Sequence, residues 1–170
     1  ADVRVVGWVG ADEAGHELRR LLAAAGVDTD GLLEHDSAPT VVKTRVVAGD
    51  THTARQQVVR IDRGRGFPLG RTARTALLEG VRHAARDVRA VVLSDYGYDS
   101  VTPDLARPLI ARWRRGGVVT GVDARYRLAS YRGVTLATPN EGEAASAAGI
   151  AISDEASLVR AATRLRRRMR

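Results

Sequence analysis

Asn140 and Glu143 are the residues of this chain whose types and spacing point most directly to chemistry. They lie in the segment from Thr138 to Glu143, where an amide and two carboxylates fall within four residues. An amide and a carboxylate spaced N-x-x-E can hold a hydrated Mg²⁺ beside nucleotide phosphates, because this cation binds through one or two carboxylates and several waters. The same residue types favour the first turn of a helix. Taken alone, the pattern favours a helix cap.

The neighbouring residues place this segment where a strand passes into a helix. Residues 133–137 predict a short apolar strand, residues 141–148 predict a helix rich in Ala and Glu, and Pro139 suits the break between them. In an open α/β sheet, ligands bind outside the carboxyl ends of the strands, where helix N-termini offer free N–H groups. A metal and phosphate site is therefore the functional interpretation of the segment.

The same alternation of strand and helix recurs along most of the chain. Apolar runs predict strands at 3–9, 90–94 and 118–122, and helical spacing predicts helices at about 12–25, 72–85 and 102–115, with Thr102-Pro103 as an N-terminal signal and Gly26 and Gly116-Gly117 as stops. Continuous apolar strands separated by helices are typical of a parallel sheet covered on both faces. The sequence therefore predicts an α/β fold.

One segment interrupts this alternation. Residues 40–47 and 57–61 are two β-rich runs with interleaved polar residues, joined by a polar turn at about 48–55. They predict a hairpin with one solvated and one buried face, lying off the main sheet as a lid. In the functional interpretation, Lys43 and Arg45 point at an anionic substrate when the lid closes. In the alternative, the hairpin only covers core and its cations form a solvated face.

The net charge of +7 comes from a chain in which Lys43 is the only lysine and every other basic residue is arginine. This looks like a compositional bias and weakens the charge as an argument for nucleic acid. The run from Arg164 to Arg170 fits the solvated face of a helix whose Leu158, Ala162, Leu165 and Met169 face inward. With 4% aromatic residues, the chain has few stacking platforms for single strands. We therefore do not expect nucleic acid as a partner.

Composition removes several other classes of function. The chain has no cysteine, so disulfides and thiolate metal sites are excluded, and its four histidines show no metal-ligand spacing. No apolar run approaches membrane-spanning length and no signal peptide is recognisable, so we expect no membrane partner and a cytoplasmic location. The 170 residues are enough for a single domain.

Together, the ordered segments of the chain resemble the ribokinase or PfkB family of carbohydrate kinases, and most closely its heptose 7-phosphate kinases. The matching segments are Val6 to Gly15 ("VGxVGxDxxG"), Ala25 to Thr29 ("AGVDT"), Pro39 to Val46 and Gln56 to Asp62 (the two strands of the lid), Val91 to Gly97 ("VVLSDYxKG") and Tyr131 to Glu143 ("YRGATLxTPNxxE"). The resemblance covers nearly the whole chain in order.

The resemblance implies a Rossmann-like, ribokinase-type parallel sheet flanked by helices. Residues 1–170 would form a single, partial PfkB-type kinase domain, with a lid hairpin at about 39–63 inserted in it. ATP and Mg²⁺ are the implied cofactors, and a sugar or sugar phosphate is the implied substrate.

The same resemblance implies roles for particular residues. Asn140 and Glu143 would organise Mg²⁺ and the ATP phosphates, and Asp95 would lie at the sugar end of the cleft. Lys43 and Arg45 would meet the substrate phosphate, and Asp123 matches the acid of a "DPK" segment.

The chain also departs from the family pattern. The "DPK" segment reads Asp123-Ala124-Arg125, and Tyr98 stands where the heptose kinases have a lysine. The family's "GAGD" segment, which carries the catalytic base, would follow Arg170, so we expect impaired catalysis from this chain alone. The alternative is a non-catalytic α/β binding or assembly remnant, whose lid pairs with another copy in a homodimer.

Overall fold

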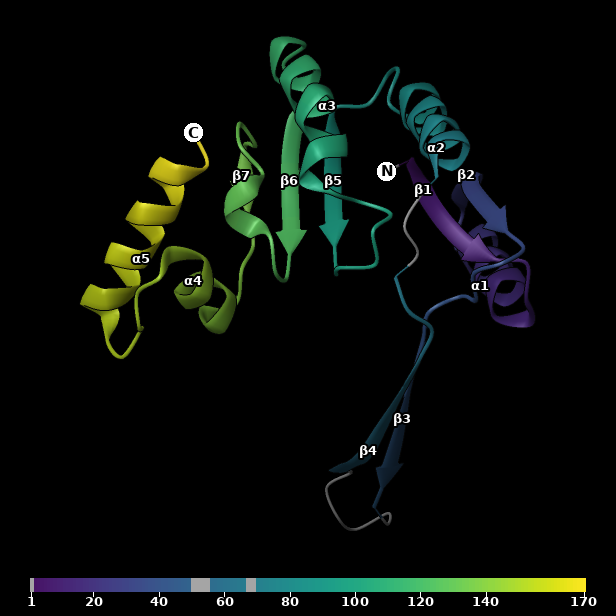
Figure 1. Cartoon of the computed structure of the whole chain (residues 1–170), viewed down its shortest axis with the longest axis horizontal. Helices are drawn as coiled ribbons and strands as arrows, with labels where there is room; N and C mark the ends of the chain where they lie inside the picture. The colour runs from purple at the N-terminus through teal and green to yellow at the C-terminus, as the bar shows by residue number, and fades with distance from the viewer. Residues whose placement is uncertain (1, 50–55, 67–69) are drawn as a thin grey trace. The chain divides into compact units, whose positions relative to one another are not determined.

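The structure is a computed structural model that describes residues 2–49, 56–66 and 70–170. Its described residues form two compact units, which divide between Ala84 and Ala85. Figure 1 labels the helices and strands of each unit. No helix among the described residues is both long and apolar enough to cross a membrane.

The first unit is built on two parallel strands, β1 (Val3–Gly10) and β2 (Val27–His35), connected by helix α1 (Glu13–Ala24). Their pairing runs from Val3 opposite Val27 to Gly10 opposite His35. Helix α2 (Arg71–Ala84) lies against both strands. The predicted strand and both helices of this unit are confirmed within a residue or two. The strand β2 was not predicted, because Asp28, Asp30 and Gly31 mask its alternating pattern.

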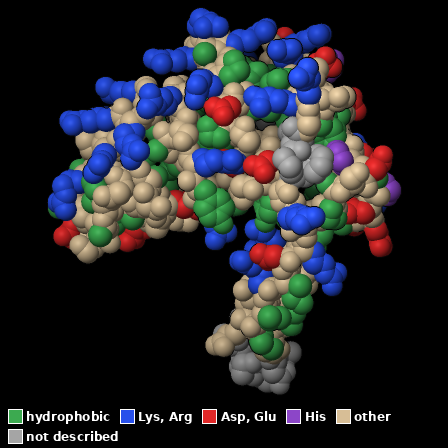
Figure 2. Space-filling view, viewed as in Figure 1, with side chains coloured by type: hydrophobic (Ala, Val, Ile, Leu, Met, Phe, Trp, Pro, Cys, Tyr) green, Lys and Arg blue, Asp and Glu red, His purple; other side chains and the backbone are tan. Residues whose placement is uncertain are grey.

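The predicted hairpin is also confirmed. Strands β3 (Val42–Ala48) and β4 (Gln56–Arg63) pair antiparallel and project from the rest of their unit as a narrow ribbon (Figure 1). The expected alternation of polar and apolar residues is present, but the apolar face is not buried. Its Val46, Val59 and Ile61 are each 44% to 46% exposed. Figure 2 shows apolar side chains open along this ribbon. Most of the predicted turn, residues 50–55, lies outside the described residues.

The second unit holds a three-stranded parallel sheet. Its elements are β5 (Ala90–Asp95), α3 (Pro103–Arg115), β6 (Val119–Ala124), the short 3-10 helix η1 (Leu128–Ser130), β7 (Leu136–Ala137), α4 (Glu141–Ala148) and α5 (Glu155–Arg168), with strand order β5-β6-β7. The core consists of apolar side chains from α3, β6, η1 and the last two helices, among them Leu105, Ile110, Trp113, Val122, Leu128, Ala148, Ala161 and Leu165. Parallel pairing with intervening helices confirms the predicted α/β class.

Two predictions for this unit need correction. The strand predicted at 133–137 is reduced to Leu136–Ala137, because Gly133 adopts a positive φ of 82° and its N–H donates to the carbonyl of Met169. The predicted inward face of α5 is shifted by one residue at its start. Ser157 and Ala161 are buried there, whereas Leu158 is 44% exposed.

Candidate functional site

The three strands of the second unit end at one edge of their sheet. In the parallel register, Asp95 lies opposite Ala124, Ser94 lies opposite Asp123, and Val122 lies opposite Ala137. The chain leaves β7 at Ala137 and enters α4 at Glu141, after three connecting residues. Asp95, Asp123, Asn140 and Glu143 therefore lie at the same edge, which we call the carboxyl-end edge.

Asn140 and Glu143 form a capping box at the start of α4. The side-chain oxygen Oδ1 of Asn140 accepts the backbone N–H of Glu143 at 2.9 Å, and Oε2 of Glu143 accepts the backbone N–H of Asn140 at 3.0 Å. The capping interpretation left open by the sequence is therefore confirmed. It does not use the whole site, because Oε1 of Glu143 and the N–H groups of Glu141 and Gly142 have no hydrogen-bond partner among the described residues.

The free groups at this helix start can serve a phosphate and a cation together. Unpaired N–H groups at a helix N-terminus attract anions, and a free carboxylate oxygen can hold a water of a hydrated Mg²⁺. The described residues contain no cluster of three or more residues able to hold a metal ion. The donor set therefore fits Mg²⁺ held largely by water and phosphate oxygens, but not a metal held by protein ligands alone.

Asp123 is joined to the same edge through Tyr96. Its Oδ2 accepts the phenol hydroxyl of Tyr96 at 2.7 Å. The pKa of Tyr96 is raised above its usual value, first by this hydrogen bond and the charge of Asp123, and in smaller part by the charge of Glu143. Tyr96 and Asp123 thus form one hydrogen-bonded pair at the carboxyl-end edge.

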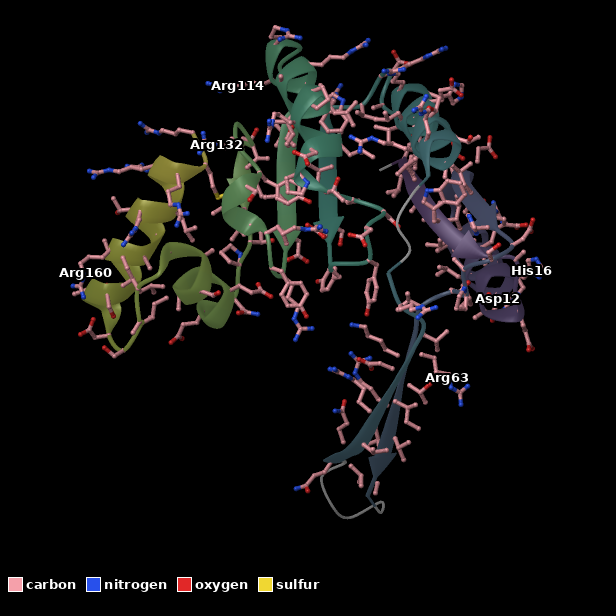
Figure 3. The ribbon with its side chains drawn as sticks, in the orientation of Figure 1. Asp12, His16, Arg63, Arg114, Arg132 and Arg160 are labelled. Carbon is pink, nitrogen blue, oxygen red and sulfur yellow. The ribbon has the colours of Figure 1, made fainter. Side chains whose placement is uncertain are left out.

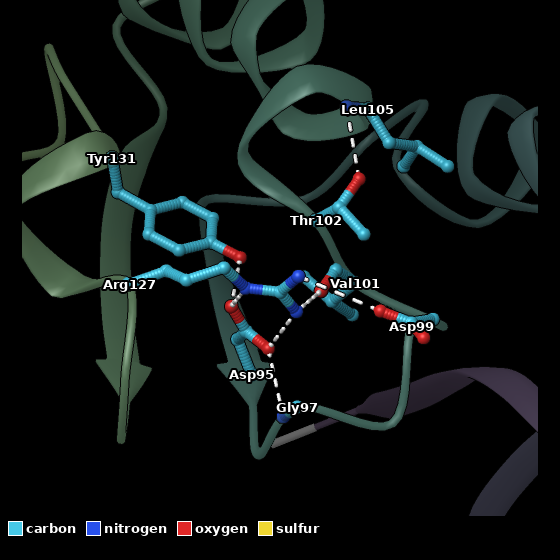
Figure 4. Close-up of polar contacts among 8 residues, drawn as sticks. All are labelled: Asp95, Gly97, Asp99, Val101, Thr102, Leu105, Arg127 and Tyr131. Carbon is cyan, nitrogen blue, oxygen red and sulfur yellow. Dashed lines mark hydrogen bonds and ion pairs between the residues drawn. The ribbon is translucent and has the colours of Figure 1, made fainter. Parts of the chain in front are cut away.

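Asp95 is the most buried charged group at this edge, with 2% of its surface exposed. Figure 4 shows the four donors that surround its carboxylate. Arg127 donates from Nε to Oδ2 at 2.9 Å and from Nη2 to Oδ1 at 2.7 Å. The hydroxyl of Tyr131 donates to Oδ2 at 2.7 Å, and the N–H of Gly97 donates to Oδ1 at 3.0 Å.

Burial and hydrogen bonding act on Asp95 in opposite directions. Burial alone would raise its pKa, but the hydrogen bonds from Arg127, Tyr131 and Gly97 outweigh this and hold the pKa below its usual value. Arg127 also reaches Asp99 and the carbonyl of Val101, so the cluster fixes the loop that follows β5. A direct contact between Asp95 and a sugar would require one of its four donors to be displaced.

The two side-chain partners of Asp95 were not predicted from the sequence. Arg127 and Tyr131 lie 32 and 36 residues further along the chain. No local pattern links positions so far apart, and an Arg after a strand is usually a solvated residue. Only the closeness of the ends of β5 and β6 could have suggested the pairing.

Lys43 and Arg45 lie in the first unit, on the hairpin. In the register of the two strands, Lys43 lies opposite Asp62 and Arg45 lies opposite Arg60. These four charged residues occupy one face, and Arg60 forms an ion pair with Asp62 at 2.9 Å. The predicted site residues are thus gathered into two groups, one in each unit.

Comparison with known proteins gives these groups a context. The profile of the pfkB family carbohydrate kinase matches residues 1–169. The chain is 40% identical over 164 residues to the bifunctional protein HldE of Geobacter metallireducens, and 36% identical over 162 residues to that of Wolinella succinogenes. The matches cover 96% and 95% of this chain but 32% and 33% of those relatives. This chain therefore spans about a third of the length of these two relatives.

Solved structures show a similar fold at low sequence identity. The 2-dehydro-3-deoxygluconokinase of Thermotoga maritima matches with a TM-score of 0.71 at 14% identity, and covers 99% of this chain and 55% of its own. The ribokinase of Arabidopsis thaliana, solved with ribose and ATP, matches with a TM-score of 0.66 at 17% identity, over 98% of this chain and 52% of its own. These similarities confirm the ribokinase-type fold and show that this chain holds part of it.

Proposed function

Because this chain belongs to the pfkB family of carbohydrate kinases, we propose that its carboxyl-end edge handles the phosphates of ATP during phosphoryl transfer to a sugar or sugar phosphate. The observation that carries the proposal is the start of α4, where Oε1 of Glu143 and the N–H groups of Glu141 and Gly142 stay available beyond the capping box. Phosphoryl transfer depends mainly on positioning and on neutralising charge, and these groups supply both.

The roles follow from the chemistry of each group. The N–H groups at the start of α4 would bind phosphate oxygens, and Glu143 and Asn140 would orient the water shell of Mg²⁺. When bound, Mg²⁺ supplies positive charge between the phosphates. The carboxylate of Asp123, which accepts a hydrogen bond from the hydroxyl of Tyr96, would add negative charge beside the Mg²⁺ site. Asp95 would act by fixing the loop after β5 through Arg127.

We also propose that the substrate of the reaction is a heptose phosphate. The resemblance of residues 91–97 and 131–143 to the heptose 7-phosphate kinases supports a heptose 7-phosphate-like substrate. The cytoplasmic location stays a prediction. A coupled assay of ADP release on a panel of hexose and heptose phosphates tests the choice of sugar.

The charged face of the hairpin would bind the phosphate of such a substrate. We expect the double substitution Lys43→Gln and Arg45→Gln to weaken binding of heptose 7-phosphate to the chain about tenfold, because two exposed charge-assisted contacts are removed. Calorimetric titration measures the change. Arg63→Gln is the matched control, since Arg63 lies on the same hairpin but on its other face (Figure 3). An equal loss in this control would show only a general effect of net charge.

The other face of the hairpin supports a second proposal, pairing with another copy of the chain. Val46, Val59 and Ile61 present an exposed apolar surface on an isolated two-stranded ribbon, which is marginally stable in water without a covering partner. We expect concentration-dependent dimerisation in sedimentation velocity, abolished by Ile61→Lys. Val119→Lys, at a residue equally exposed in the second unit, should leave it intact. A monomer at all concentrations would contradict the proposal.

A further inference from the structure

Asp12 and Thr40 join two segments that lie 28 residues apart. Asp12 precedes α1, and its Oδ1 accepts the N–H of Gly15 at 2.8 Å, as an N-cap does. The same Oδ1 accepts the hydroxyl of Thr40 at 2.6 Å, and Oδ2 accepts the N–H of Thr40 at 2.8 Å. The hydroxyl oxygen of Thr40 in turn accepts the N–H of Gly10 at 2.9 Å. Thr40 stands two residues before β3, at the root of the hairpin.

This arrangement goes beyond an ordinary helix cap. In α3 and α5, the N-cap side chains accept hydrogen bonds only within the first turn of the helix. Thr102 accepts the N–H of Leu105, and Asp154 accepts the N–H of Ser157. Asp12 alone among the described caps uses both oxygens to hold a distant residue. The pKa of Asp12 is lowered first by the hydroxyl and then by the N–H of Thr40. The carboxylate is therefore bonded more extensively to the hairpin root than to its own helix.

Two glycines make the close approach possible. A Cβ at Gly10 would lie 2.5 Å from the carbonyl oxygen of Ala38 and 2.7 Å from the N of Thr40. A Cβ at Gly15 would lie 2.9 Å from the hydroxyl oxygen of Thr40 and would also collide with the carbonyl of Gly10. All of these distances are below 3.0 Å, closer than real Cβ atoms come to such neighbours. The backbone thus has room for this contact only because these two positions carry no side chain.

The returning strand passes the same point. Gly64 follows β4 with a positive φ of 89°, and a Cβ there would lie 3.0 Å from the Cα of Val41 and 3.2 Å from the carbonyl oxygen of Thr40. The first and last residues of the hairpin root therefore lie against each other beside Asp12. Beyond the root, every residue of β4 is exposed, so the root determines where the ribbon points.

We propose that Asp12 and Thr40 form a latch that fixes the hairpin root to the turn between β1 and α1, and that Asp12 is a positioning residue for the hairpin. Its importance for catalysis rests on the proposed lid function, but the latch itself does not. Figure 3 shows Asp12 at this turn and Arg63 at the end of the returning strand. Releasing the latch would let the hairpin reorient while β1, β2 and α1 stay folded.

The test is nuclear magnetic relaxation of backbone amides in the whole chain, without nucleotide or sugar. Thr40→Val removes only the hydroxyl, and Thr40→Ser restores it. Asp12→Ser keeps a cap for α1 but is too short to bridge to Thr40. In Thr40→Val and Asp12→Ser, we expect the order parameters of β3 and β4 amides to fall from about 0.85 to below about 0.6, the ranges of rigid and flexible backbone. Thr40→Ser should match the unaltered chain.

Asp154→Ser is the matched control, because it alters an aspartate cap of the second unit that bonds within its own first turn, to Ser157. Unchanged hairpin order in Thr40→Val and Asp12→Ser, with the amide spectrum of β1 and β2 preserved, would overturn the latch. So would an equal fall in Thr40→Ser or Asp154→Ser. Because no substrate is present, a chain that proves to have no kinase function leaves this result unaffected. A confirmed latch with no effect on sugar-phosphate binding would instead count against the lid.

Discussion

Replacement of Arg127 by leucine is expected to lower the free energy of unfolding of the second unit by about 3 kcal/mol at neutral pH, the order found when one partner of a buried ion pair is removed. Asp95 would keep its place in the core with 2% exposure, but two of its four hydrogen-bond donors would be gone. Desolvation of the remaining carboxylate would then be uncompensated, and the loop after β5 would lose its contacts to Asp99 and Val101.

The loss should depend on pH, and its sign follows from the lowered pKa of Asp95. A carboxylate whose pKa is lower in the folded state stabilises the fold fully above its ordinary value of 3.8, and this contribution disappears as the pH falls through the folded value. The difference between the unaltered chain and Arg127→Leu should therefore be largest at pH 6 to 7 and shrink as the pH is lowered toward 3.

Urea denaturation followed by tryptophan fluorescence measures this difference. The chain has two tryptophans, Trp8 in the first unit and buried Trp113 in the second, so a Trp8→Phe background makes the signal specific for the second unit. Arg125→Leu is the control, because Arg125 is exposed and has no ion pair among the described residues, and it should cost less than about 0.5 kcal/mol. A difference below about 1 kcal/mol, or one independent of pH, would contradict the assigned role of Arg127.

The second large effect is expected on nucleotide binding. We predict that Glu143→Gln weakens the binding of Mg²⁺-ATP roughly 10- to 100-fold, the range seen when a group that supports a metal through its outer shell is lost. Glutamine still accepts the N–H of Asn140, because a capping box tolerates either residue. The substitution therefore separates metal binding from helix capping, and stability should change by less than about 0.5 kcal/mol.

Glu141→Gln provides the matched comparison. Glu141 lies in the same first turn of α4, carries the same charge and takes no part in the capping box. Its loss should reduce Mg²⁺-ATP affinity no more than about twofold, since only the general field of the site changes. Calorimetric titration of both variants with Mg²⁺-ATP gives the two affinities. Equal losses in the two variants, or none in Glu143→Gln, would remove the metal role from Glu143.

Local signals were enough to predict most of the elements that carry the site. Thr102-Pro103 at the start of α3 and the N-x-x-E segment at the start of α4 are encoded in adjacent residues, and both helices begin where predicted. Strand β2 escaped prediction because it exists through pairing with β1, not through its own composition. The inward face of α5 was misplaced in its first turn because Ser157 is buried to complete a capping box with Asp154, whereas Leu158 is left exposed.

The residues of the candidate site also divide into those that could be predicted from local sequence and those that could not. Asn140 and Glu143 could be found from the sequence because four residues contain the whole arrangement. The cluster of Asp95, Arg127 and Tyr131 could not, because it depends on the side-by-side ends of β5 and β6. The latch of Asp12 and Thr40 is equally non-local. Long-range polar contacts depend on tertiary geometry, so residue types alone do not reveal them.

Titration of the unaltered chain with ATP, in the presence and in the absence of Mg²⁺, tests the central claim most directly, namely that the start of α4 is a nucleotide phosphate site. We predict saturable binding that weakens when Mg²⁺ is removed, because Glu143 then repels the phosphates without a cation between them. Absence of binding, or binding that Mg²⁺ does not affect, would contradict the claim and leave Asn140 and Glu143 with the helix cap alone.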